Sequence, residues 1–143
     1  MIDLGARQGN GIGRDFMFDE GVFIVDCFCP DLAFPADQLA IQAIDQNLFI
    51  TDDDHDQAYL RKLESIQTSI LTFKPELIIY SAGTDILEGD PGSQLIITGE
   101  GIVKRDEMVF EMAVKNKVPI LMLLADGNNP EVISSSIQNL KRK

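Results

Sequence analysis

The sequence predicts an α/β fold of three layers, in which a parallel sheet of about five strands is covered by helices. Two observations lead to this fold class. Short apolar runs alternate along the chain with helical patterns, an order that returns successive strands to one parallel sheet. Two of these runs, 77–81 and 118–124, are almost entirely apolar. Continuous apolar runs of this length are typical of strands that are buried on both faces of a sheet.

The other predicted strands are short. Residues 1–4 read as the end of a buried strand that leads directly into a glycine-rich loop over 5–13. Residues 22–28 form a β-branched and aromatic run, and residues 47–51 follow as a further short strand. Ligands of such sheets bind beyond the carboxyl ends of the strands, so the loops that follow the strands are the places to look for a site.

Capping residues and apolar spacing predict the helices. Asp37 and Thr98 are placed to cap a short and a long helix, respectively. Apolar residues at spacings of three and four over 60–73 predict one amphipathic helix, which Pro75 ends. Pro130 opens a last predicted helix, with its apolar positions at Ile133, Ile137 and Leu140.

Composition and charge exclude several classes of function. The chain has 143 residues, the size of a single domain, and its formal net charge of −11 argues against a broad nucleic-acid interface. No segment has the length and apolarity of a membrane span, and no signal peptide is recognisable. The two cysteines, Cys27 and Cys29, are expected to be buried reduced thiols. We therefore expect a single domain over 1–143 in the cytoplasm, without nucleic-acid or membrane partners.

Two further patterns have plain structural explanations. Gly9, Gly11 and Gly13 follow a strand, but their G-x-G-x-G spacing matches neither the dinucleotide-binding nor the P-loop pattern. The acidic cluster of Asp85, Glu88 and Asp90 is of a type that can hold a divalent ion. A turn shaped by these side chains is the favoured interpretation.

Four segments carry a family resemblance. Residues 1–13 (MIDLGARQGNGIG) and 80–90 (YSAGTDILEGD), followed by 99–107 (GEGIVKRDE) and 119–122 (PILM), resemble the histone deacetylase family, closest to its class IV branch. The resemblance implies an arginase-like α/β fold, of which only the C-terminal half is present. It also implies that the 1–4 strand lies between the 22–28 and 77–81 strands. The 118–124 strand is then expected at an edge without its outer neighbour.

The resemblance also implies a zinc site whose ligand positions are changed here. The family writes the first loop as I-D-L-D-A-H-Q-G-N-G, and its second Asp and its His bind zinc, at the positions of Gly5 and Arg7. Asp85 matches the remaining ligand. Glycine offers no side chain, and arginine has no lone pair for a metal. We therefore do not expect zinc, and instead expect Arg7 to form an ion pair with Asp85.

The family's other catalytic groups are not matched. Its histidine pair belongs to the N-terminal half, and His55, the only histidine, lies in an acidic loop where a solvated role is expected. Tyr59 and Tyr80 do not stand at the position of the family's oxyanion-binding tyrosine, so no catalytic residue is assigned.

A structural monovalent cation, potassium or sodium, is the one family site that the resemblance retains. It would bind to Asp3 and Asp26, with the carbonyls of Gly5, Arg7 and Cys27 completing a shell of oxygen ligands. The alternative is that Asp3 and Asp26 pair with Arg7. The loop residues Gly9, Asn10, Gly11 and Gly83 are expected to shape the binding loops around this site.

Three functional hypotheses follow. The first is a truncated histone-deacetylase-like protein without zinc-dependent deacetylase activity, which acts in binding or scaffolding. The alternative is a zinc-dependent deacylase, active on acyl-lysine only when another chain supplies the N-terminal half. The third is a fragment of a disrupted gene that folds without a selected function. Because a strand edge is exposed, a homo-oligomer or a partner that covers this edge is expected.

Overall fold

The computed structural model describes residues 1–33 and 36–127. The predicted helix opened by Pro130 lies outside the described residues. Five strands form one sheet in the order β3-β2-β1-β4-β5, and every pair is parallel. The strands are β1 (Ile2–Asp3), β2 (Val25–Phe28), β3 (Gln46–Phe49), β4 (Ile78–Ala82) and β5 (Ile120–Leu124). The predicted fold class is confirmed.

The short strand β1 lies at the centre of the sheet. Ile2 is in register with Val25 on one side and with Tyr80 on the other. The predicted position of the 1–4 strand, between its two neighbours, is therefore correct. β5 lies at the edge, as expected, and pairs with β4 through Ile78 and Ile120.

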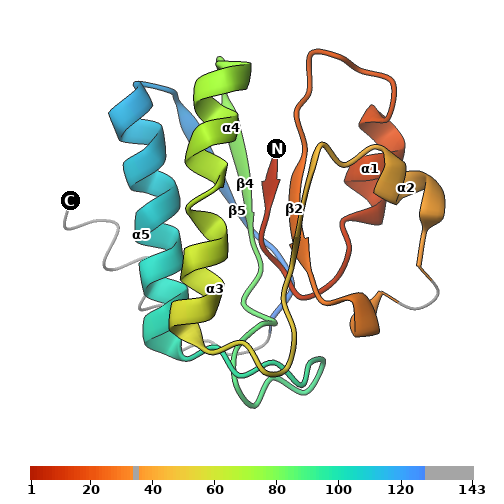
Figure 1. Cartoon of the computed structure of the whole chain (residues 1–143), viewed down its shortest axis with the longest axis vertical. Helices are drawn as coiled ribbons and strands as arrows, with labels where there is room; N and C mark the ends of the chain where they lie inside the picture. Colours follow the sequence, from red (N-terminus) through yellow and green to blue (C-terminus); the bar gives the residue numbers. More distant parts are fainter. Residues whose placement is uncertain (34–35, 128–143) are drawn as a thin grey trace.

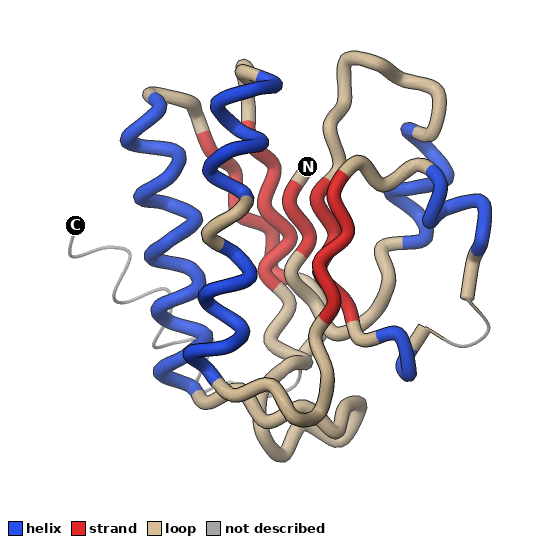
Figure 2. The backbone as a smooth tube through the Cα atoms, viewed as in Figure 1, coloured by secondary structure: helices blue, strands red, loops and turns tan. Residues whose placement is uncertain are grey.

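Helices cover both faces of the sheet (Figures 1 and 2). On one side lie α3 (Asp56–Leu63), α4 (Ile66–Phe73) and α5 (Gly99–Asn116), and on the other lie α1 (Asn10–Phe16) and α2 (Gln38–Gln42). A short 3-10 turn, Pro30–Leu32, follows β2. None of the described helices is long and apolar enough to cross a membrane.

The apolar core divides between the two layers of helices. The larger cluster joins the sheet to α3, α4 and α5 and includes Leu63, Ile66, Ile102 and Val109, all fully buried. A smaller cluster on the other side is formed by Ile24, Phe28, Ala33 and Ile44. Cys27 and Cys29 are buried free thiols, as predicted.

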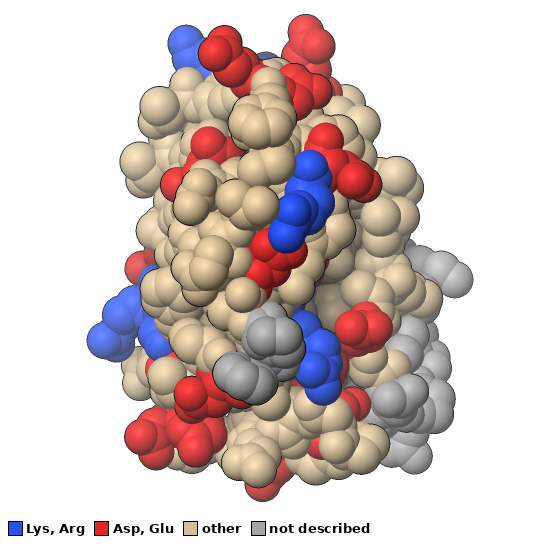
Figure 3. Space-filling model, turned by 90° about the vertical axis from the view of Figure 1, so that its right-hand side faces the viewer, with Lys and Arg blue, Asp and Glu red and all other residues tan. Residues whose placement is uncertain are grey.

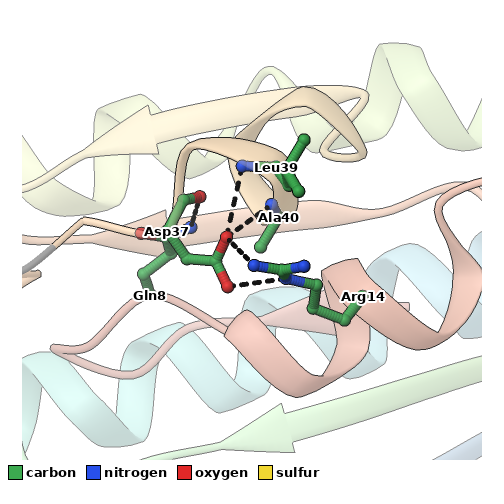
Figure 4. Close-up of polar contacts among 5 residues, drawn as sticks. All are labelled: Gln8, Arg14, Asp37, Leu39 and Ala40. Carbon is green, nitrogen blue, oxygen red and sulfur yellow. Dashed lines mark hydrogen bonds and ion pairs between the residues drawn. The ribbon is translucent and has the colours of Figure 1, made fainter.

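Asp37 connects the layer of α1 and α2 to the loop after β1 (Figure 4). Its carboxylate accepts hydrogen bonds from the Leu39 and Ala40 amides at 3.2 and 3.1 Å, which caps α2 as predicted. The same carboxylate pairs with the Arg14 guanidinium at 2.8 Å. The Asp37 carbonyl accepts a hydrogen bond from Gln8 Nε2 at 3.1 Å. Asp37 therefore holds together α1, α2 and the loop that follows β1.

Thr98 caps α5 as predicted, and a second contact joins this cap to α3. Thr98 Oγ1 accepts a hydrogen bond from the Gly101 amide at 3.1 Å. The Thr98 amide and hydroxyl both donate to the Asp56 carboxylate, at 2.8 and 2.6 Å. A Cβ on Gly101 would lie 2.5 Å from Asp56 Oδ1, so glycine is required for this close approach.

Two helix predictions were wrong. Residues 10–16 form α1, although the sequence predicted a loop from 5 to 13. Glycines lower helix propensity, but Gly13 is buried against Ala40 of α2, and this packing outweighs the propensity. The predicted single helix over 60–73 is two helices, because the Glu64 amide bonds to the Arg61 carbonyl and tightens the turn between α3 and α4.

The edge strand β5 is less buried than its sequence predicted. Leu121, Leu123 and Leu124 are 51%, 45% and 60% exposed. Among the described residues, β5 pairs only with β4, and neither α1 nor α2 covers it (Figure 1). An apolar run alone does not distinguish a central strand from an edge strand, and the difference is set by its neighbours.

Candidate functional site

A cavity of about 360 Å³ lies at the carboxyl ends of β1 and β4, where ligands bind in parallel α/β sheets. Its lining includes Asp3, Gly5, Arg7, Gly83 and Asp85. These residues come from the loop after β1 and the loop after β4, which are far apart in sequence. The structure thus brings together the two segments that the sequence singled out.

Asp85 joins the two loops. Its Oδ1 accepts a hydrogen bond from the Ala6 amide at 2.9 Å, and its side chain is buried. Burial raises the pKa of this carboxyl, and the Ala6 hydrogen bond opposes the rise. Gly83 permits the contact, because a Cβ there would lie 2.9 Å from both Asp85 Oδ1 and Gly5 Cα.

The predicted ion pair between Arg7 and Asp85 is wrong. Arg7 is exposed, and its Nη2 donates to the Gly92 carbonyl at 3.1 Å. Nor does Arg7 pair with Asp3 or Asp26 in the described structure. The Arg7 guanidinium stays in water because its desolvation would cost more free energy than one partly buried ion pair would recover.

Gly5 stands at one of the zinc-ligand positions that the resemblance implies, and it has no side chain there. A Cβ at Gly5 would lie 3.4 Å from Asp85 Oδ1 and 3.6 Å from Asp3 Oδ1, which are ordinary contact distances. The loop therefore has room for a Cβ at this position, beside the Asp85 carboxylate.

Asp3, which lines the cavity, and Asp26 of the neighbouring strand β2 form an acidic pair. The Gly9 amide donates to Asp26 Oδ2 at 2.8 Å, and a Cβ on Gly9 would lie 3.0 Å from Asp3 Oδ2 and 3.3 Å from Asp26 Oδ2. Asp26 is 1% exposed, and its Oδ1 has no hydrogen-bond partner among the described residues. Burial, together with the charge of Asp3, raises the pKa of Asp26 to about 7. Burial also raises the pKa of Asp3.

The Asp26 carboxyl predicts a pH dependence of stability in buffers without alkali cations. Its folded-state pKa of about 7 exceeds the ordinary value of 3.8, so the folded protein binds more protons than the unfolded chain between these values. The free energy of unfolding of the wild type, relative to Asp26→Asn, should fall as the pH rises from about 4 to 7, by on the order of 1 kcal/mol per pH unit. Urea unfolding of both proteins at a series of pH values measures this difference. A difference that stays constant with pH would contradict the prediction.

The residues present do not fit a zinc site. Among the described residues, no group of three His, Cys, Asp or Glu side chains is arranged to hold a metal ion. His55 precedes α3 as its N-cap residue and is exposed. Tyr59 and Tyr80 are fully buried, and Tyr80 donates to Asp106 rather than facing the cavity.

The glycine-rich loop supplies part of the cavity wall. Gly9, Asn10 and Gly11 line the cavity. Because Gly9 has no side chain, its backbone can lie close to the carboxylates of Asp3 and Asp26. Asp90 acts within its own loop, as its Oδ1 accepts a hydrogen bond from the Gly92 amide at 2.9 Å. This contact agrees with the favoured interpretation of the 85–90 cluster as a turn.

Sequence reasoning missed two residues of this region. Asp126 lines the cavity, and its carbonyl accepts a hydrogen bond from the Thr84 amide at 2.6 Å. Arg105 of α5 reaches the loops from behind and is fully buried. The sequence signal for Arg105 was the charged pair Arg105-Asp106, which lies next to apolar positions of the predicted helix.

Comparison with known proteins identifies the family. The model of the histone deacetylase domain matches residues 1–143. The chain belongs to the histone deacetylase domain family. A relative in this family, histone deacetylase 2 of Arabidopsis thaliana, is 42% identical over 147 aligned residues, which cover 100% of this chain and 38% of that protein.

Solved deacetylase-family structures share the fold. The acetylpolyamine aminohydrolase of Burkholderia pseudomallei superimposes with a TM-score of 0.78 at 18% identity, over 99% of this chain and 43% of that one. The HD domain of HDA15 gives a TM-score of 0.76 at 18% identity, over 99% and 42% of the two chains. The chain thus spans about two fifths of the length of these relatives, and the arginase/deacetylase-like fold is confirmed over that part.

Proposed function

We propose that this histone-deacetylase-family chain lacks zinc-dependent deacetylase activity and acts in binding or scaffolding. The proposal rests on which residues occupy the three implied zinc-ligand positions, Gly5, Arg7 and Asp85, in the cavity. Of the three zinc-ligand positions that the family resemblance implies, only Asp85 offers a ligand atom, since Gly5 has no side chain and Arg7 extends outward to Gly92. One buried carboxylate does not supply the three protein ligands that a catalytic zinc needs.

Zinc analysis and an activity assay together test this proposal. The purified protein, incubated with zinc and dialysed, should contain far less than one zinc per chain by elemental analysis. It should also show no turnover of an acetyl-lysine peptide. Stoichiometric zinc with turnover would overturn the proposal.

The alternative is a deacylase that is active when another chain supplies the N-terminal half. The chain covers 38% of the Arabidopsis relative, which leaves room for a missing part. The positions of Gly5 and Arg7 weigh against this alternative, because they lie in the part present here and a partner does not replace them. Turnover that appears only after mixing with the N-terminal part of a family member would favour it.

We propose that an alkali cation, potassium or sodium, binds between Asp3 and Asp26. The support is the unpartnered, buried Asp26 Oδ1 and the close approach that Gly9 allows. Carboxylate and carbonyl oxygens are hard ligands of the kind that such cations prefer. The carbonyls of Gly5, Arg7 and Cys27 remain the proposed completing ligands. The Asp26 position also supports the class IV branch, for whose members the resemblance implies an aspartate there.

Potassium should stabilise the wild type more than Asp26→Asn at equal ionic strength. The comparison of potassium chloride with choline chloride at pH 8 isolates the effect, because Asp26, with a pKa of about 7, is then largely charged. Equal stabilisation of the two proteins in the thermal unfolding midpoint would count against the cation.

The exposed edge of β5 supports the proposal of a protein partner or a second copy of this chain. Leu121, Leu123 and Leu124 present apolar side chains, and an edge strand offers unpaired backbone groups. Nucleic acid is not the proposed partner, since the face in Figure 3 shows scattered acidic side chains and no continuous basic patch. Light scattering of the purified chain tests this proposal. An oligomer would support it, and a stable, well-folded monomer would remove the reason to propose a partner.

A further inference from the structure

The side chain of Arg105 reaches from α5 to the backbone of both site loops. It is 0% exposed and is among the largest fully buried side chains of the described residues. Its Nη1 donates to the Leu4 carbonyl at 3.2 Å and to the Gly83 carbonyl at 2.5 Å. Leu4 directly precedes Gly5, and Gly83 lies two residues before Asp85. A single nitrogen therefore bonds to the ends of two strands just where each enters the cavity.

The guanidinium charge is balanced by its neighbour in sequence. Asp106 Oδ1 accepts from Arg105 Nε at 2.8 Å and lies 2.8 Å from Nη2. Tyr80 Oη donates to the same oxygen at 2.5 Å, and the guanidinium carbon lies 5.8 Å from the centre of the Tyr80 ring. The planar group is thereby held in one orientation by a carboxylate and by the strand that precedes Gly83.

We propose that Arg105 is a positioning residue that fixes the β1 and β4 loops relative to each other without a metal ion. A metal bound to side chains of both loops would fix the same spacing. Here the loops are joined instead through their backbone carbonyls by a side chain that is always charged and that is bonded on its other edge to Asp106. The cavity consequently keeps its shape in the metal-free protein.

This role differs from that of an ordinary core residue. A buried apolar side chain stabilises the whole fold, whereas Arg105 makes its loop-directed hydrogen bonds at one end of the sheet only. Its loss should therefore loosen the Ala6–Asp85 contact more than it loosens the far end of the sheet. The inference is independent of the proposed alkali cation and of any activity.

Amide hydrogen exchange in chelator-treated protein tests the proposal. The Ala6 amide, which donates to Asp85, reports on the loops, and the Ile78 amide, which donates to the Pro119 carbonyl, reports on the opposite end of the sheet. In Arg105→Lys, the ratio of the Ala6 to the Ile78 exchange rate should rise by about 10-fold or more, and further in Arg105→Met. Val109→Ala, on the buried face of the same helix, is the matched control and should leave the ratio unchanged.

An unchanged ratio in Arg105→Lys, or an equal rise in Val109→Ala, would overturn the proposal. The wild type provides a second test that does not depend on how the variants fold. In metal-free solution, the Arg105 side-chain NMR signals should show a protected Nε–H and separate, slowly exchanging Nη groups. Averaged Nη signals and a rapidly exchanging Nε–H would show a side chain that rotates freely and would also overturn the proposal.

Discussion

Replacing Gly5 with aspartate and Arg7 with histidine together should give the chain a zinc site. The Gly5 Cβ would lie 3.4 Å from Asp85 Oδ1, so the new carboxylate starts beside the ligand that is retained. Removing Arg7 takes away a fixed positive charge, and histidine adds a nitrogen ligand. Zinc affinity should rise by about 100-fold or more, since even outer-shell changes alter metal affinity by roughly 10–100-fold. Elemental analysis and the visible spectrum of the cobalt-substituted protein measure the gain.

The variant with Gly5→Ala and Arg7→His is the matched control. It introduces the same Cβ and the same imidazole but no carboxylate, and it should bind zinc clearly more weakly than the aspartate variant. If the aspartate–histidine variant folds normally and takes up no zinc, the loops do not hold the geometry described here. Activity is not part of this prediction, because the family's histidine pair is not in this chain.

Gly13→Ala should lower the free energy of unfolding by about 1–2 kcal/mol, because the cost of overpacking, about 1–3 kcal/mol, exceeds the gain of about 1 kcal/mol at most from the helix propensity of alanine. A Cβ at this buried position would lie 2.8 Å from the Ala40 carbonyl oxygen and 3.0 Å from the Ala40 Cβ. The Ala40 backbone belongs to α2, which Asp37 caps and Arg14 holds, so it cannot move aside cheaply. Urea or thermal unfolding followed by circular dichroism measures the change.

Gly11→Ala in the same helix is the control and should have the opposite sign. No atom lies within 4 Å of a Cβ at Gly11, and alanine favours the helix over glycine by about 1 kcal/mol at most. If both substitutions stabilise the protein, α1 does not pack on α2 as described. If both destabilise it, residues 10–16 require glycine for a reason other than packing.

Sequence alone predicted the parallel sheet, the order of β2, β1, β4 and β5 within it and the location of the cavity. The order followed from the family resemblance, and the caps at Asp37 and Thr98 followed from local hydrogen-bonding rules that do not depend on distant contacts. The helix α1 was missed because its stability comes from the packing of Gly13 on Ala40, which no local pattern records.

Several residues that the sequence singled out line one cavity, but the predicted partner of Arg7 was wrong. Asp85 and Arg7 both line the cavity, yet the long, exposed side chain of Arg7 is directed by solvation and by its hydrogen bond to the Gly92 carbonyl. Arg105 was missed for the opposite reason. A buried arginine on a helix is expected to be rare, and only the folded structure shows which carbonyls justify it.

The central position of β1 constrains the order in which the chain can fold during synthesis. Ile2 leaves the ribosome well before its partner Tyr80, which follows much later in the chain. Until β4 has emerged, β1 can pair only with β2, and one side of the strand stays open. Contacts between such distant segments form slowly, and open apolar strands are sites of aggregation. The nascent chain is therefore expected to depend on chaperone protection until the 78–82 segment has been made.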